Sequence, residues 1–280
     1  MALSTPPRAL FFDVFGTCVD WRTSVTQALY VHSHAALNSP TASLASRVRL
    51  KASDMSLDHW GDFAQQWRDT YHIFTRRLAA DPGVPFKSVD EHHFDSLKQL
   101  VHEWDLDGLW TLEELRAMSL VWHRLEPWPD TVPGIGLLSS TFWTCTLSNG
   151  NYSLLTDLTA HARIPFTHIF SAEMFGTYKP APEVYRGASE KLDLPMKECV
   201  MVAAHLDDLK AAKSQGMQVI YVERLGEEKW SAEEVERARS DGWVDVWVGP
   251  GLDHGGFLEV AQKLGLQVPR GPDRTLSSSV

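Results

Sequence analysis

The chain has 280 residues, of which 44% are hydrophobic and 22% charged, and its formal net charge is −10. This composition is typical of a globular protein with one large domain or two modest ones, and the negative charge argues against nucleic acid and acidic membranes as partners. No apolar run could span a bilayer, the first residues lack a signal-peptide layout, and the three cysteines have neither disulfide nor zinc spacing, so we expect a cytoplasmic protein with reduced thiols.

Strand and helix patterns alternate along most of the chain. Apolar runs predict five buried strands, at residues 9–12, 144–147, 200–202, 218–222 and 244–248. Helical patterns lie between or after the later strands, at residues 152–161, 182–192, 207–215 and 257–264. Because strands that alternate with helices form right-handed crossovers, we expect an α/β fold with a Rossmann-like parallel sheet.

A long helical segment interrupts this alternation after the first strand. Strand signals vanish between residues 21 and 125, and five apolar positions there share one helix face: Trp60, Phe63, Ala64, Trp67 and Tyr71. We therefore predict three parts of the chain: a discontinuous core of residues 1–20 and 126–268, an inserted helical cap domain of residues 21–125, and a flexible tail of residues 269–280.

Asp13 is the most informative residue for function. The first strand ends at Asp13, and Gly16-Thr17 forms a turn after it. The side chain therefore stands at the carboxyl edge of the predicted sheet, where open α/β folds bind their ligands. A carboxylate in this place can act as a nucleophile, although it can also simply cap the following turn. Residues 148–150 and 203–205 follow two other predicted strands, and we expect them at the same edge.

Four short motifs follow one another along the chain: Asp13-x-Phe15-Gly16-Thr17, Leu147-Ser148-Asn149-Gly150, Tyr178-Lys179-Pro180 followed by Tyr185, and an acidic motif that ends in Asp208. Each motif is weak alone. In this order they make the chain resemble the haloacid dehalogenase superfamily, and within it the L-2-haloacid dehalogenase (type II) branch. The resemblance covers the core from about residue 8 to residue 224, and the cap more loosely.

The resemblance implies a hydrolase that converts (S)-2-haloacids into 2-hydroxy acids without a cofactor or a metal ion. The Asp13 carboxylate would attack the substrate α-carbon, expel the halide with inversion, and form an ester that water then hydrolyses. Lys179 would keep Asp13 ionised, and Arg68 with Asn149 would receive the halide. Further substrate-binding residues implied by the family are Phe15 as an apolar wall, the hydroxyls of Thr17 and Ser148, and Tyr185 beside the nucleophile.

Two of these assignments have an ordinary structural alternative. Arg68 could be a surface cation on an amphipathic helix, although its neighbours Trp67 and Tyr71 favour a pocket. Tyr185 could be a core aromatic residue of the helix at residues 182–192. The sequence alone leaves both alternatives open, because a helical pattern shows which residues share a face but not what that face contacts.

The fourth motif departs from the type II pattern, which has two Ser residues, an Asn, and an Asp three residues after the Asn. Here Ala203 and Ala204 replace both Ser residues, His205 replaces the Asn, and Asp208 keeps the Asp. We hypothesise that His205, as a neutral imidazole, is the general base for ester hydrolysis, and that Asp208 orients it or holds Lys179. Alternatively, His205 only fills the space of the Asn and makes one hydrogen bond.

Three other functions stay open. The same covalent mechanism could open the ring of a cyclic amino acid, whose amine would need a proton donor on leaving. A phosphatase is disfavoured because Phe15 stands where phosphatases of the superfamily have a second Asp, and Ala203 or Ala204 where they have a metal ligand. A non-catalytic binding protein is disfavoured because it needs no nucleophile. The expected partner is a small anionic 2-halocarboxylic acid, and a homodimer is expected because family members are often dimers.

Overall fold

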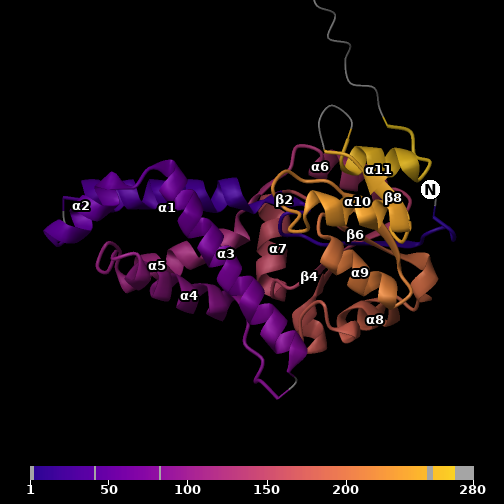
Figure 1. Ribbon diagram of the computed structural model, residues 1–280, viewed down its shortest axis with the longest axis horizontal. Coiled ribbons are helices and arrows are strands. Elements are labelled where there is room, and N and C mark those ends of the chain that lie inside the picture. The colour runs from indigo at the N-terminus through magenta and orange to yellow at the C-terminus, as the bar shows by residue number, and fades with distance from the viewer. Residues whose placement is uncertain (1–2, 41, 82, 251–254, 269–280) are drawn as a thin grey trace, which may run out of the picture.

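The computed structural model describes residues 3–40, 42–81, 83–250 and 255–268, so the tail at 269–280 lies outside the described residues. A six-stranded parallel sheet forms the core (Figure 1), in the order β5-β4-β1-β6-β7-β8. Its strands are β1 (Ala9–Phe12), β4 (Trp143–Ser148), β5 (His168–Ser171), β6 (Cys199–Ala203), β7 (Gln218–Val222) and β8 (Val246–Val248). The predicted α/β fold with a parallel sheet is therefore confirmed.

The first strand, β1, lies in the middle of the sheet, which explains its apolar sequence. All four of its residues are fully buried, because β4 and β6 pair with it on either side and a parallel sheet is covered on both faces. Phe12, the last residue of β1, pairs with Thr146 of β4 and Val202 of β6. The three strands therefore end side by side, and the residues that follow them meet at one edge.

Helices cover both faces of the sheet. In Figure 1, α6 (Thr131–Leu138) and α11 (Phe257–Lys263) pack together above the strands, whereas α8 (Pro182–Lys191) and α9 (Leu206–Ser214) lie below them. The remaining core helices are α7 (Tyr152–His161), α10 (Ala232–Asp241) and the short 3₁₀ helices η2 (Ala172–Phe175) and η3 (Met196–Glu198). The four helices predicted at residues 152–161, 182–192, 207–215 and 257–264 are confirmed as α7, α8, α9 and α11, with each end within one residue of the predicted position.

The sequence patterns do not reveal two core elements. The edge strand β5 has only four residues, and its first two, His168 and Ile169, are half-buried, so it lacks a continuous apolar run. The helix α10 has a strongly polar sequence, and Ala238 is the one buried side chain among its described residues. The last strand begins at Val246 rather than at residue 244.

The segment between β2 (Val19–Asp20) and β3 (Glu126–Pro127) contains helices and no strands among its described residues (Figure 1, left). β2 and β3 pair antiparallel where the chain leaves the core and returns to it, which supports our proposal that residues 21–125 form the cap. The helices are α1 (Trp21–Asn38), α2 (Ser46–Asp54), α3 (Leu57–Ala80), α4 (Val89–Glu103), α5 (Leu112–Ser119) and the 3₁₀ helix η1 (Leu120–His123).

The long helix α3 carries an apolar face of the cap. It begins with a capping box, in which the Ser56 hydroxyl accepts a hydrogen bond from the backbone N–H of His59. The five residues predicted to share one face are all buried: Trp60, Phe63, Ala64, Trp67 and Tyr71. Arg68 is buried as well, and its guanidinium lies over the ring of Phe15, which follows β1 in the core. This face of α3 therefore contacts the edge of the sheet.

The composition leads to expectations for both the cysteines and the apolar character of the helices. Cys18, Cys145 and Cys199 are buried and free, in agreement with the predicted reduced thiols. In the described part of the chain, no helix combines the length and the apolar character needed to cross a membrane.

A buried histidine links the cap to the core. His123, at the end of η1, lies between α7 and α4, with Nδ1 2.8 Å from Asp157 Oδ2 and Nε2 3.0 Å from Asp90 Oδ1. Asp90 also accepts a hydrogen bond from the side chain of Asn151 at 2.8 Å. Burial lowers the pKa of His123, but the two carboxylates outweigh burial and raise the pKa above its usual value.

We expect His123 to make the stability of the protein depend on pH. In an unfolded chain its pKa is about 6.5, so protonation stabilises the fold fully below that pH, and this contribution is lost as pH rises through the higher folded pKa. His123→Gln should therefore lower the free energy of unfolding by about 1 kcal/mol more at pH 6 than at pH 9. Urea unfolding of both proteins at both pH values measures this difference, and an equal loss at the two pH values would contradict the prediction.

Candidate active site

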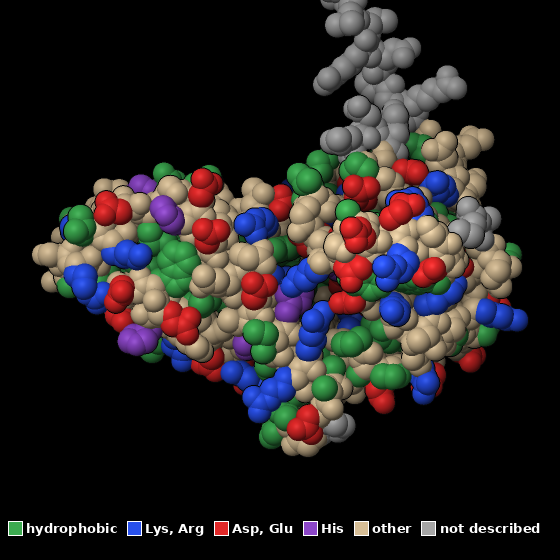
Figure 2. Space-filling view, viewed as in Figure 1, with side chains coloured by type: hydrophobic (Ala, Val, Ile, Leu, Met, Phe, Trp, Pro, Cys, Tyr) green, Lys and Arg blue, Asp and Glu red, His purple; other side chains and the backbone are tan. Residues whose placement is uncertain are grey.

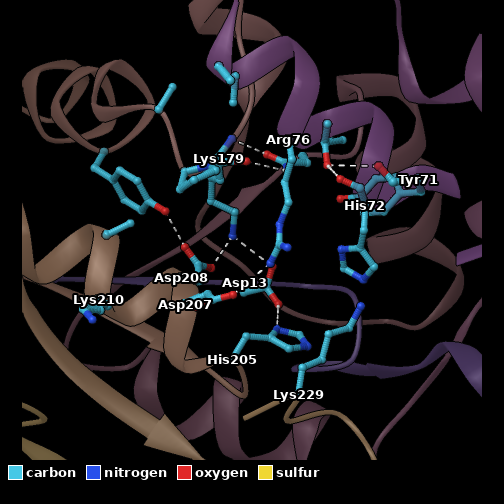
Figure 3. A pocket seen from close by; sticks show the side chains of 18 of the residues that line it. Asp13, Tyr71, His72, Arg76, Lys179, His205, Asp207, Asp208, Lys210 and Lys229 are labelled. Atoms are coloured by element: carbon cyan, nitrogen blue, oxygen red, sulfur yellow. Dashed lines mark hydrogen bonds and ion pairs between the residues drawn. The ribbon is translucent and has the colours of Figure 1, made fainter. Parts of the chain in front are cut away.

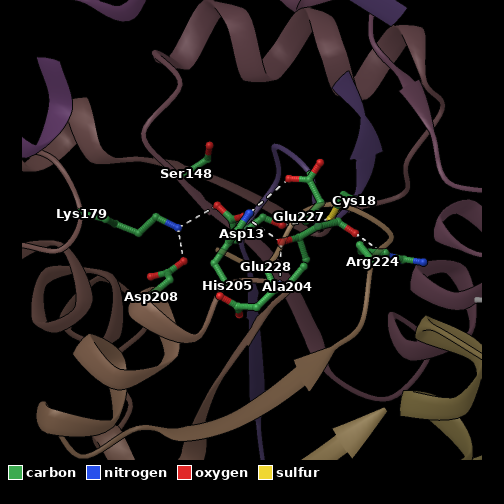
Figure 4. Close-up of polar contacts among 12 residues, drawn as sticks. Asp13, Cys18, Ser148, Lys179, Ala204, His205, Asp208, Arg224, Glu227 and Glu228 are labelled. Atoms are coloured by element: carbon green, nitrogen blue, oxygen red, sulfur yellow. Dashed lines mark hydrogen bonds and ion pairs between the residues drawn. The ribbon is translucent and has the colours of Figure 1, made fainter. Parts of the chain in front are cut away.

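Asp13 lies at the sheet edge where β1 ends, and both oxygens of its carboxylate are held (Figure 4). Its backbone N–H donates to the carbonyl of Val202 at 3.0 Å. Oδ1 accepts a hydrogen bond from Lys179 Nζ at 2.9 Å, and Oδ2 accepts one from the Thr17 hydroxyl at 2.7 Å. Burial alone would raise the pKa of Asp13, but Lys179 and His205 hold it far below its usual range. The carboxylate is therefore ionised.

Lys179 connects Asp13 to a second carboxylate, Asp208. Lys179 Nζ lies 2.5 Å from Asp208 Oδ2, and the Tyr185 hydroxyl donates to Asp208 Oδ1 at 2.6 Å. Burial would lower the pKa of Lys179, but the two carboxylates raise it, so the ammonium stays charged. Burial and the charge of Asp13 raise the pKa of Asp208. Asp208 therefore holds Lys179, and Tyr185 contributes a hydroxyl to this cluster as well as filling core space.

His205 stands between two carboxylates at the beginning of α9. Its Nδ1 is 3.2 Å from Asp13 Oδ2, and its Nε2 is 3.2 Å from Oε2 of Glu227, which lies in the loop after β7. Burial lowers the pKa of His205, but its hydrogen bonds to Asp13 and Glu227 and their charges outweigh burial and raise the pKa to about 10. This corrects the expected neutral imidazole: in the free protein, His205 is an imidazolium at neutral pH.

Arg68 is a buried cation without a carboxylate partner among the described residues. It projects from α3 with 4% of its surface exposed. Its guanidinium lies over the rings of Tyr71, Phe15 and Trp21, at 4.5, 5.2 and 5.5 Å from their centroids. The buried Nε atom has no hydrogen-bond partner in the part of the chain that is described. Arg68 is therefore no surface cation, and its charge is available to an anion that enters the site.

Asn149 and Ser148 follow β4 at the same edge. Asn149 Oδ1 accepts a hydrogen bond from the backbone N–H of Lys179 at 2.7 Å, and its Nδ2 donates to the carbonyl of Lys179 at 3.3 Å. The amide thus fixes the loop that carries Lys179. The Ser148 hydroxyl accepts a hydrogen bond from the backbone N–H of Gly150 at 3.2 Å, so its contact with the nucleophile or the substrate stays a prediction.

A cavity of about 730 Å³ opens beside Asp13. In Figure 3, Tyr71, His72 and Arg76 reach into it from α3, whereas His205 points toward Asp13 and Lys229 reaches into the cavity from the core side. The predicted site residues that line the cavity are Asp13, Arg68, Asn149, Lys179, Tyr185, His205 and Asp208. The other three predicted residues, Phe15, Thr17 and Ser148, are fully or almost fully buried and are not part of the described lining.

Charged side chains surround the outer part of this cavity, where the cap meets the core (Figure 2). Arg76 of α3 pairs with Asp207 of α9 at 2.8 Å, and Lys229 lies 3.7 Å from Asp69 of α3. Burial lowers the pKa of Lys229, and the nearby cation Arg68 contributes in the same direction. Cationic side chains from both the cap and the core therefore border the cavity, although Arg76 and Lys229 each lie beside a carboxylate.

The donors near Asp13 are poorly suited to hold a metal ion. No group of three or more His, Cys, Asp or Glu side chains that could hold one occurs among the described residues. Ala203, the last residue of the neighbouring strand β6, and Ala204, which follows it, have methyl side chains that carry no metal-binding atom. Each oxygen of Asp13 already accepts from a neighbouring hydroxyl or ammonium group.

Two buried residues of the site are missing from the sequence-based prediction. Glu227 faces His205 through Oε2, and its Oε1 accepts a hydrogen bond from the indole N–H of Trp21 at 2.8 Å. Glu227 belongs to a polar run that is typical of an exposed loop, and Trp21 begins the first cap helix. No local pattern in the sequence marks either residue as part of the site, because such patterns report burial through apolar periodicity.

Comparisons with known proteins decide the family. A family model described as haloacid dehalogenase-like hydrolase matches residues 7–216 of the chain. The chain belongs to the haloacid dehalogenase-like hydrolases. The resemblance inferred from the four motifs is thereby confirmed, and the fold with its inserted cap is the fold of this family.

Named relatives of this hydrolase are dehalogenases. The chain is 25% identical over 226 residues to (S)-2-haloacid dehalogenase 1 of Pseudomonas sp. (strain CBS-3), which covers 79% of this chain and 86% of that protein. Among solved structures, the L-2-haloacid dehalogenase PA0810 is 31% identical, with a TM-score of 0.73 and coverage of 92% of this chain and 99% of that chain. The defluorinating L-2-haloacid dehalogenase Rha0230 is 28% identical, with a TM-score of 0.73 and coverage of 92% and 95%.

Proposed function

We propose that this hydrolase cleaves the carbon–halogen bond of (S)-2-haloacids, without a metal ion and through an ester on Asp13. The observation that carries the proposal is that two opposite charges line one cavity: the buried, ionised carboxylate of Asp13, and the guanidinium of Arg68, which has no carboxylate partner among the described residues. The relatives that are named as 2-haloacid dehalogenases, at 25–31% identity, support it.

In the first half-reaction, an oxygen of Asp13 donates an electron pair to C2 of the substrate. The carbon–halogen bond breaks with its electron pair on the halide, and C2 is inverted. Lys179 keeps the nucleophile ionised and fixes one of its oxygens. The desolvated guanidinium of Arg68 stabilises the negative charge that develops on the halogen, and Asn149 borders the same space.

In the second half-reaction, water attacks the carbonyl carbon of the Asp13 ester, and the 2-hydroxy acid leaves. His205, whose Nδ1 is 3.2 Å from the Asp13 carboxyl, is our candidate for the base that accepts the proton of this water. An imidazolium cannot accept a proton. Esterification removes the charge of Asp13, which is one of the two anions that hold the proton on His205, so the base forms only when the ester exists.

The experiment that tests this function is a single turnover in heavy-oxygen water (H₂¹⁸O), with enzyme in excess over (S)-2-chloropropionate. We expect release of chloride and of (R)-lactate, because the displacement inverts C2. The hydroxyl oxygen of this first lactate should be unlabelled because it comes from Asp13, and mass spectrometry should find the label in the Asp13 carboxylate. (R)-2-chloropropionate is the matched control and should release no chloride.

Other outcomes of the same experiment would overturn parts of the proposal. Label in the first lactate would mean that water attacks C2 directly, and it would refute the ester. No chloride from either enantiomer would refute the halide leaving group. Parallel assays would then assign the reaction: turnover of azetidine-2-carboxylate would indicate ring opening, and Mg²⁺-dependent phosphate release from an aryl phosphate would indicate a phosphatase.

A further inference from the structure

We propose that Glu227 is a positioning residue for ester hydrolysis, which keeps His205 turned with Nδ1 toward Asp13 and retains the proton of the neutral ring on Nε2. The inference rests on the function proposed above, in which Asp13 carries the ester and His205 accepts the proton of the attacking water. Neither half-reaction otherwise uses the buried carboxylate of Glu227.

Glu227 is buried and is fixed through both of its carboxylate oxygens. Its side chain is 8% exposed, although Leu225 in the same loop is 91% exposed. Oε1 accepts a hydrogen bond from the Trp21 indole at 2.8 Å, and Oε2 is 3.2 Å from His205 Nε2. Oε2 also packs on Gly16, where a Cβ atom would collide with it. The loop after β7 therefore turns one glutamate inward to a defined place beside the imidazole (Figure 4).

The contact with Glu227 decides which nitrogen of His205 carries the proton when the ring is neutral. A carboxylate accepts hydrogen bonds but cannot donate them, so it retains the proton on Nε2. Nδ1, which faces Asp13, then presents its lone pair on the side of the ester. Without Glu227, the neutral ring could carry its proton on Nδ1 and donate it to the ester carbonyl, which would leave no acceptor for the proton of water.

The charge of Asp13 changes during the reaction, and this change sets the order of the proton transfers at His205. Before the reaction, both N–H groups of the imidazolium donate to carboxylates. Alkylation expels the halide and makes Asp13 a neutral ester. The Nδ1 proton of His205 then passes to solvent, whereas the Nε2 proton stays on His205 in its hydrogen bond to Glu227. Water then adds to the ester carbonyl carbon while its proton moves to Nδ1. The intermediate expels the substrate oxygen, which takes the proton of the newly formed Asp13 carboxyl. One water is consumed, and one halide and one proton are released.

Trp21 offers a second way to disturb Glu227. Its indole N–H donates to Glu227 Oε1, and its ring lies under the guanidinium of Arg68 at 5.5 Å. Trp21→Phe keeps an aromatic ring beside Arg68 and removes the N–H that fixes the carboxylate. This variant therefore loosens Glu227 without removing its charge.

Rapid-quench kinetics of Glu227→Gln with (S)-2-chloropropionate separate the two half-reactions. Halide release in the first turnover should stay within about threefold of wild type, whereas ester hydrolysis should slow about 100-fold, because support of the general base is lost. The Asp13 ester should accumulate, as seen by mass spectrometry, and a halide burst should precede a slow steady state. Trp21→Phe should slow hydrolysis less, and Glu227→Asp, which restores the charge, should recover part of the rate.

The pH dependence of ester hydrolysis separates positioning from a merely structural role. The rate should rise with pH as His205 loses its proton in the ester form. Because Glu227 holds that proton, its replacement by Gln should move the rise to lower pH by about one pH unit. Glu223→Gln is the matched control, since Glu223 lies exposed just after β7, and it should retain the rates and pH profile of wild type.

The outcomes distinguish this inference from the proposed function. If wild type forms the ester but Glu227→Gln hydrolyses it at an unchanged rate with an unchanged pH profile, the role of Glu227 is refuted and the function stands. If wild type forms no ester on Asp13, the proposed function itself is refuted. If Glu227→Gln does not fold, as judged by circular dichroism, Trp21→Phe decides, and unchanged ester hydrolysis in that variant refutes the inference.

Discussion

Replacing Asp13 by Asn should abolish halide release, with a loss of at least about 10⁴-fold in kcat/KM. The amide oxygen carries no negative charge and is a poor nucleophile, and Lys179 and His205 would lose the anion that they share. Halide release from (S)-2-chloropropionate measures the effect, and mass spectrometry should find no ester on residue 13. Asp54→Asn is the control, because Asp54 is exposed at the end of α2 and should leave activity unchanged. Activity of Asp13→Asn within tenfold of wild type would assign the nucleophile elsewhere.

The same variant also imitates the neutral charge of the ester, which gives a second measurement. Asp13 and Glu227 together raise the pKa of His205 to about 10 in the free protein. With Asn at position 13, only Glu227 remains to hold the proton, so the pKa of His205 should fall while it still exceeds the value of about 6.5 for an unperturbed imidazole. Titration of the His205 ring by NMR tests this. An unchanged pKa of His205 would contradict the proposal that His205 loses its proton once Asp13 is esterified.

The sheet edge of the site could be predicted because buried parallel strands have a plain sequence signal. β1, β4 and β6 are short apolar runs that end in small or polar residues, and their alternation with helices implies that they run parallel. That inference already brings Asp13, Asn149 and His205 to one edge, as the register shows. No knowledge of side-chain contacts is needed for this step.

The places of Lys179 and Arg68 depended on the family resemblance. Lys179 lies in a loop whose sequence has no hydrophobic periodicity, and it contacts Asp13, which is 166 residues away in the sequence. The pattern of α3 predicts that Arg68 adjoins buried aromatic residues, but it does not tell where the cap sits over the sheet. That position follows from contacts such as Arg68 over Phe15, which join two elements far apart in the chain.

The charge of His205 could not be predicted, because it depends on a residue with no sequence signal. Glu227 lies in a polar loop, and it is turned inward by contacts with Trp21, at 206 residues' separation, and with Gly16. Local patterns report burial through apolar periodicity, so they miss a single inward-facing carboxylate. The expected neutral imidazole followed from the ordinary pKa of histidine, and the second carboxylate corrects it.

Replacing Lys179 by Met should lower kcat/KM by about 10³-fold at pH 7, because the variant loses both the orientation and the charge balance of the nucleophile. Nζ contacts Asp13 at 2.9 Å and Asp208 at 2.5 Å, all inside the protein. Without the ammonium, two carboxylates remain buried together, which disfavours ionisation of both. The loss of a buried partner should also reduce the free energy of unfolding by about 3–5 kcal/mol.

The pH dependence of Lys179→Met identifies the cause of its lost activity. In wild type the pKa of Asp13 lies far below its usual range, so protonation of the nucleophile should not limit the first half-reaction at mildly acidic pH. In the variant the pKa of Asp13 rises, so single-turnover halide release should increase with pH over a range where wild type is flat. Lys197→Met, at an exposed position in η3, is the control and should keep the wild-type profile. A variant that is slow but equally flat would mean that Lys179 orients Asp13 without controlling its ionisation, since a purely geometric defect lowers the rate by the same factor at every pH.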